Sequence, residues 1–128
     1  MISTNKCIKI IITDDEPDIL QLLNSELTDF DENFEITLAN SGYEALNCLQ
    51  SEGYDMLITD IAMPDMDGFE LYKRAKDIRP DISIIMMTGF GYDPNHTVVN
   101  AKKAGLKDVI FKPFDISKLV SMIYQRVH

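Results

Sequence analysis

Polar side chains that could act together follow four of the short apolar segments in this sequence of 128 residues. They are Asp14, Asp15 and Glu16 after the first segment, Asp60 after the third, Thr88 at the end of the fourth, and Lys112 after the fifth. Carboxylates held close together repel one another and favour a hard cation such as Mg²⁺, which prefers oxygen ligands. A lysine adds a mobile positive charge, and a threonine hydroxyl can donate to an anionic oxygen. This combination is suited to accepting and holding a phosphoryl group.

The spacing of apolar residues predicts five strands that alternate with five helices. The expected strands are 8–13, 34–39, 56–60, 82–88 and 109–111. The expected helices are 17–27, 42–52, 69–79, 94–104 and 116–127, and residues 29–33 are expected to form a turn. This alternation is typical of a parallel sheet covered by helices on both faces. In such a sheet, sites form beyond the carboxyl ends of the strands, which is where the polar side chains above are found.

Composition is that of one ordinary globular domain, with 45% apolar and 26% charged residues. We expect a single domain over 1–128 with its core at about 7–127. No apolar run approaches the ~20 residues that cross a bilayer, so we expect no membrane insertion. Cys7 and Cys48 lack disulfide or metal-ligand spacing, which predicts reduced thiols and a cytoplasmic protein.

Net charge is −9 and unevenly distributed along the chain. Residues 1–72 hold 16 acidic and 2 basic side chains, whereas residues 102–128 hold 2 acidic and 6 basic ones. The overall negative charge argues against direct nucleic-acid binding. The basic cluster in the last part of the chain is either a solvated face or a surface for an acidic partner, and both alternatives stay open.

Five motifs in the same order make the sequence resemble a response-regulator receiver domain of two-component signalling. They are Asp14-Asp15-Glu16-Pro17, Asp60-Ile61-Ala62-Met63-Pro64-Asp65-Met66-Asp67-Gly68, Met87-Thr88-Gly89, Ala104-Gly105 and Lys112-Pro113-Phe114. The long second motif is highly specific. The resemblance covers nearly the whole chain and implies a flavodoxin-like α/β fold. That fold is a doubly wound five-stranded parallel sheet of order 2-1-3-4-5 with five helices, in three α/β/α layers.

The resemblance also implies a role for each residue at the strand ends. Asp60 would be the phosphoryl acceptor, Thr88 and Lys112 would bind phosphoryl oxygens, and Asp14, Asp15, Asp60 and the backbone carbonyl of Ala62 would hold Mg²⁺. The phosphoryl group would come from the phospho-histidine of a sensor histidine kinase or a phosphotransfer protein. Acyl-phosphate hydrolysis would later reset the switch, which is not a turnover enzyme.

Signal output is implied to leave through the fourth helix, the fifth strand and the fifth helix, toward a separate or covalently linked output partner. Two features differ from the common family pattern. Val109 stands where many receivers carry Tyr or Phe, and the loop after Thr88 is about two residues longer than usual. Leu22 lies at the flank of the first helix, where receivers dock their kinases.

Other functions fit the residues less well. A mononucleotide binder with this sheet would need a Gly/Ser/Thr-rich loop after the first strand, and that loop is acidic here. An aspartyl phosphatase would place its nucleophile in an Asp-x-Asp motif after the first strand. A receiver used only for binding would have lost its acidic residues. The acidic run before Pro17 could also serve only to favour a helix start.

Overall fold

One parallel sheet forms the centre of the chain in a computed structural model, which describes residues 7–88, 109–112 and 115–127. Its strands are β1 (Ile8–Thr13), β2 (Phe34–Ala39), β3 (Met56–Asp60), β4 (Ser83–Thr88) and β5 (Val109–Phe111). They are all parallel and run in the order β2-β1-β3-β4-β5, which confirms the predicted topology. β1 and β3 are therefore central neighbours, so the groups that follow them meet at the same edge of the sheet.

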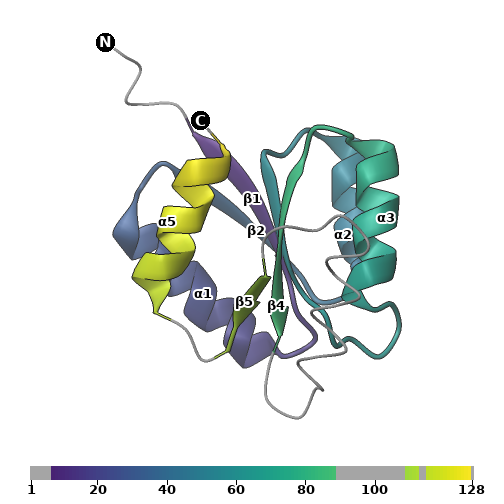
Figure 1. Ribbon diagram of the computed structural model, residues 1–128, viewed down its shortest axis with the longest axis horizontal. Helices are drawn as coiled ribbons and strands as arrows, with labels where there is room; N and C mark the ends of the chain where they lie inside the picture. Colours follow the sequence, from purple (N-terminus) through teal and green to yellow (C-terminus); the bar gives the residue numbers. More distant parts are fainter. Residues whose placement is uncertain (1–6, 89–108, 113–114, 128) are drawn as a thin grey trace.

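Helices cover both faces of this sheet (Figure 1). They are α1 (Pro17–Phe30), α2 (Gly42–Ser51), α3 (Gly68–Ile78) and α5 (Ile116–Arg126). α1 and α5 lie side by side on one face, and α2 and α3 lie on the other, which gives the expected three layers. The predicted helix 94–104 falls outside the described residues. Within the described ranges, no helix is long and apolar enough to span a membrane.

The side chains of β1 show how the sheet divides the core into two halves. Ile10 and Ile12 pack on the α1–α5 side, whereas Ile11 between them packs on the α2–α3 side. All three are fully buried, because a parallel strand with helices on both faces has no solvent-facing side. Each fully buried aliphatic side chain of this kind contributes about 1.5–3 kcal/mol to folding.

Local capping explains where two of the helices begin. The Ser41 hydroxyl accepts a hydrogen bond from the Glu44 backbone N–H at 3.2 Å, before α2. The Asp67 carboxylate accepts one from the Glu70 N–H at 2.9 Å, before α3. Each cap satisfies a backbone donor that has no partner inside the helix.

The observed boundaries correct two sequence-based expectations. α1 continues to Phe30, so the predicted turn begins two residues later, where the Asp31 N–H donates to the Leu27 carbonyl at 3.1 Å. β4 begins at Ser83 rather than at residue 82. β3 ends at Asp60, as the sequence predicts. Such ends depend on hydrogen bonds that apolar spacing does not encode.

Candidate functional site

The carboxyl end of β1 delivers two carboxylates with different exposures. Asp14 is fully buried, and its Oδ1 accepts a hydrogen bond from the Glu16 backbone N–H at 3.0 Å. Asp15 is exposed, as is Glu16. The short turn into α1 places Asp14 below the surface and leaves Asp15 at the mouth of the site.

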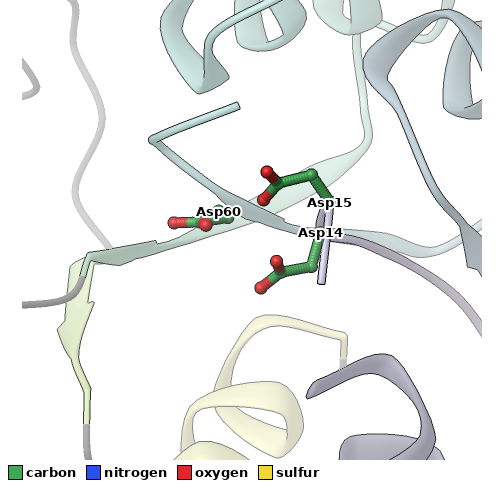
Figure 2. Close-up of side chains that lie close together, drawn as sticks. All are labelled: Asp14, Asp15 and Asp60. Atoms are coloured by element: carbon green, nitrogen blue, oxygen red, sulfur yellow. The ribbon is translucent and has the colours of Figure 1, made fainter. Parts of the chain in front are cut away.

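Asp60 enters the same space from the carboxyl end of β3. Figure 2 shows its carboxylate beside those of Asp14 and Asp15, all three reaching into one region at the edge of the sheet. Asp60 is only 5% exposed, and its Oδ1 accepts a long hydrogen bond from the Ala62 N–H at 3.3 Å. The three carboxylates can each offer an oxygen within 4.8 Å of the others.

Lys112 supplies the positive charge at this edge of the sheet. Its Nζ lies 2.9 Å from Asp14 Oδ2 and 3.6 Å from Asp60 Oδ2. Its backbone N–H donates to the Thr88 carbonyl at 2.7 Å, which ties the end of β5 to the end of β4. The lysine therefore pairs mainly with Asp14 and reaches Asp60 only at longer range.

Thr88 ends β4 and is 2% exposed. Its Oγ1 is buried and makes no hydrogen bond within the described residues. A buried hydroxyl without a partner costs free energy, and in a native structure it calls for a specific explanation such as a catalytic role or a bound water or ion. Thr88 therefore has a free donor close to where Lys112 joins the sheet.

Burial and charge shift the pKa values of the two central groups. Removal from water raises the pKa of Asp60; Lys112 works against this shift, and the negative charge of Asp14 adds to it. Burial alone would lower the pKa of Lys112, but its hydrogen bond to Asp14 and the charges of Asp14 and Asp60 raise it overall. Lys112 thus stays charged at neutral pH, and Asp60 holds its proton more readily than an ordinary aspartate.

Gly68 fixes the loop that follows Asp60. Its N–H donates to the Ile61 carbonyl at 2.9 Å. A Cβ at this position would lie 2.8 Å from the Asp60 carbonyl oxygen and 2.9 Å from the Ile61 Cα, both of them backbone atoms. Only a residue without a side chain allows α3 to start this close to the strand end.

Gly68→Ala is therefore expected to destabilise the fold by about 1–3 kcal/mol, because the added methyl group would push against backbone that cannot easily move. Urea unfolding would measure the loss. The matched control is Gly53→Ala, since a Cβ there meets nothing within 4 Å and should change the free energy of unfolding by less than about 0.5 kcal/mol. Equal stability of the two variants would contradict this account of the loop.

The charges of the site fit a divalent cation. Three carboxylates face one lysine, so two negative charges remain uncompensated if all three are ionised (3 − 1 = 2). The ligands are all oxygen atoms, one carboxylate is exposed to solvent, and Mg²⁺ characteristically keeps several waters while binding one or two carboxylates. Asp14, Asp15 and Asp60 are thus a suitable donor set for this ion.

Comparison with known proteins identifies the family. The sequence profile of the response regulator receiver domain matches residues 10–124. The chain belongs to the response-regulator receiver family. Members of this family are signalling switches rather than turnover enzymes. The receiver is 34% identical over 117 residues to the response regulator receiver protein CpdR of Brucella abortus, covering 90% of this chain and 92% of that protein.

Other relatives are longer than this receiver. It is 32% identical over 120 residues to the transcriptional regulatory protein GlrR of Escherichia coli (strain K12), covering 94% of this chain but 26% of that protein. The receiver spans about a quarter of the length of the transcriptional regulators it matches. Among solved structures, a CheY-like receiver domain protein from Methanospirillum hungatei JF-1 has a TM-score of 0.82 at 30% identity, covering 95% of this chain and 94% of that one.

Most of the residues expected to form the site do lie together. The structure brings Asp14, Asp15, Asp60 and Lys112 within reach of one another. Thr88 is joined to Lys112 through the backbone, whereas the Ala62 carbonyl stays a prediction as a ligand. Sequence reasoning missed the preference of Lys112 for Asp14, and no local signal in the sequence could have indicated it.

Proposed function

We propose that this receiver is a phosphorylation-controlled switch that accepts a phosphoryl group on Asp60. The donor would be the phospho-histidine of a sensor histidine kinase or a phosphotransfer protein. The observation that carries the proposal is the position of the Asp60 carboxylate, at a strand end beside two further carboxylates and 3.6 Å from Lys112. Family membership supports the same function.

The transfer would be a direct displacement at phosphorus. A carboxylate oxygen of Asp60 attacks, a new P–O bond forms, and the P–N bond to the donor histidine breaks. The electron pair of that bond stays on the ring nitrogen of the donor. With a proton from solvent, the donor is released as an ordinary histidine side chain. Water later attacks the acyl phosphate, releasing inorganic phosphate and restoring the Asp60 carboxylate, which resets the switch.

The side chains around Asp60 would stabilise the charge that develops during transfer. Lys112, a flexible side chain, would leave Asp14 and pair with a phosphoryl oxygen. The Thr88 hydroxyl, which has no partner among the described residues, would donate to another. Asp14, Asp15, Asp60 and the Ala62 carbonyl would hold Mg²⁺, which when bound neutralises negative charge on the phosphoryl oxygens. The pKa of Asp60 is raised by burial, and a more basic carboxylate is a better nucleophile once it is ionised.

The phosphorylated state would act on a separate or covalently linked output partner in the cytoplasm, without direct nucleic-acid binding by this domain. The output face would include β5, α5 and the predicted fourth helix, which lies outside the described residues. Val109 is half-buried and packs against the α2–α3 half of the core, whereas Ile110 beside it packs in the α1–α5 half. β5 therefore contacts both halves of the core and has no aromatic side chain at position 109. Leu22, 54% exposed on α1, would contact the kinase.

The proposal predicts that acetyl phosphate and Mg²⁺ together add one phosphoryl group per chain. Intact-mass spectrometry would measure the adduct, and peptide mapping would locate it in the segment that contains Asp60. Chelation of divalent ions should prevent the reaction, because the crowded carboxylates repel an incoming phosphoryl group when no cation is bound. An adduct in any other segment, or none in the presence of Mg²⁺, would exclude this function.

Mg²⁺ should also stabilise the unphosphorylated receiver. A ligand that binds only the folded state at about ten times its Kd adds roughly 1.4 kcal/mol, which is about 5 °C in melting temperature for a domain of this size. Calorimetry of the wild type with and without Mg²⁺ would measure the shift, and Asp15→Ala should lose most of it. The control is Asp18→Ala, an exposed carboxylate in the first turn of α1 that should leave the shift unchanged. Equal shifts in both variants would argue against Asp15 as a ligand.

A further inference from the structure

A shallow apolar groove lies between α1 and α5, away from the acidic site. It has a volume of about 340 Å³ and is lined by Phe30, Ser117, Val120, Ser121, Tyr124 and Gln125. Phe30 forms one wall and is 50% exposed, although it is large and aromatic. Burying the exposed half of such a ring would contribute about 1 kcal/mol to binding.

The groove lies far from the phosphoryl site and from Leu22. Phe30 is the last residue of α1, whose first turn follows the acidic cluster, so 14 residues at 1.5 Å each place it about 20 Å away along the helix. The same rise separates Phe30 from Leu22 by about 12 Å. A molecule seated in the groove would therefore leave both the phosphoryl site and the surface around Leu22 accessible.

Side-chain interactions hold the floor of the groove in place. The Tyr124 hydroxyl donates to Asp31 Oδ2 at 2.6 Å, and this bond raises the pKa of Tyr124 to about 12. The Tyr124 ring also packs against the Phe34 ring, with 5.7 Å between centroids. Because Tyr124 is fixed at both ends, the groove exists before anything binds, which lowers the entropic cost of binding.

The α5 side of the groove carries no charge. Its exposed lining residues are Ser117, Ser121 and Gln125, while the charged side chains of α5, Lys118 and Arg126, do not line the groove. A patch whose centre lacks charged residues and contains an exposed aromatic side chain has the composition typical of a protein interface. An ordinary solvated helix face would carry charges at such positions.

The α1 side of the groove belongs to an acidic stretch of the chain. Residues 17–33 contain five acidic side chains and no lysine or arginine. Asp29 and Glu32, on either side of Phe30 in the sequence, are both exposed. A second copy of this chain is a poor occupant, because a symmetric contact through Phe30 would bring two such acidic stretches together on chains of net charge −9.

We propose that the groove docks a basic, apolar segment of a partner protein. One apolar side chain of that segment would insert beside Phe30, and lysine or arginine side chains would face Asp29 and Glu32. Docking at this end of α1 would be independent of phosphorylation, so it would hold a partner in both states of the switch.

The test uses two short synthetic helical peptides that share leucines on one face and carry either lysines or glutamates on the other. Backbone amide chemical shifts of the receiver would map binding. The lysine peptide should shift the amides of Phe30, Ser117 and Ser121, and its affinity should fall as salt is added. The glutamate peptide should not bind, and Asp60→Asn should leave the affinity of the lysine peptide unchanged.

Variants of Phe30 distinguish the groove from general attraction to an acidic protein. Phe30→Ala should weaken binding at least about tenfold, and Phe30→Leu should retain most of it. Tyr43→Ala is the matched control, since it removes an exposed aromatic side chain on α2 and should not change affinity. Equal affinity of wild type and Phe30→Ala, or shifts mapped away from the groove, would overturn the proposal. So would self-association of the receiver that depends on Phe30, because the occupant would then be a second copy.

Discussion

Asp60→Asn is expected to abolish phosphorylation of the receiver by acetyl phosphate in the presence of Mg²⁺. The substitution keeps the size of the side chain and removes the nucleophilic oxygen, so no acyl phosphate can form at this position. Neighbouring carboxylates cannot easily replace it, because Asp14 is fully buried and already holds Lys112 at 2.9 Å. Intact-mass spectrometry of the two proteins under identical conditions would measure the loss.

Asp65→Asn is the matched control for this substitution. Asp65 lies in the same loop and is exposed, with no part in the carboxylate cluster, so its variant should be labelled like the wild type.

Asp60→Asn should also make the metal-free fold more stable at neutral pH. Because the pKa of Asp60 is raised in the folded state, the free energy of unfolding falls as pH rises from the ordinary pKa of 3.8 to the higher folded value. Asparagine does not ionise and so avoids this loss. Full labelling of Asp60→Asn would refute the assignment of the acceptor.

Lys112→Ala is expected to destabilise the metal-free receiver by about 2–3 kcal/mol at neutral pH. The substitution leaves the buried carboxylate of Asp14 without its cation and removes the charge that opposes the pKa rise of Asp60. The estimate is kept below that for a fully buried pair because the Lys112 side chain is 19% exposed. Urea unfolding without Mg²⁺ would measure the loss, and Lys118→Ala, at an exposed lysine of α5, should cost little.

The loss in Lys112→Ala should depend on pH in a defined direction. In the wild type, the raised pKa of Lys112 contributes stability that is present below its ordinary pKa of 10.5 and disappears only as pH rises through the folded value. In the variant, Asp60 takes a proton more readily, so the cost should shrink on going from about pH 8 to about pH 5.5. Asp14→Asn in the same background should recover part of the lost stability, since it removes the unpaired charge. A cost that does not change with pH or with Asp14→Asn would mean that Lys112 acts through packing alone.

Much of the fold was predictable because it depends on local patterns. Period-2 and continuous apolar runs marked all five strands, and helical spacing marked each helix that the structure describes. Helix ends were less predictable: α1 extends to Phe30 because the Leu27 carbonyl finds a donor in the Asp31 N–H. That bond depends on how the chain leaves the helix, which the apolar spacing does not specify.

Some features of the candidate site were likewise predictable from local sequence, and others depend on tertiary contacts. The long motif from Asp60 to Gly68 and the acidic run at Asp14 indicated which residues to examine, because strand ends and turn residues are readable one segment at a time. The pairing of Lys112 with Asp14 joins residues 98 positions apart, and Gly68 meets the Asp60 carbonyl only once α3 is packed. The groove beside Phe30 likewise needs α1 and α5 side by side. Those contacts follow from strand order and helix packing, which arise from the sum of many weak interactions across the whole chain rather than from any one stretch of sequence.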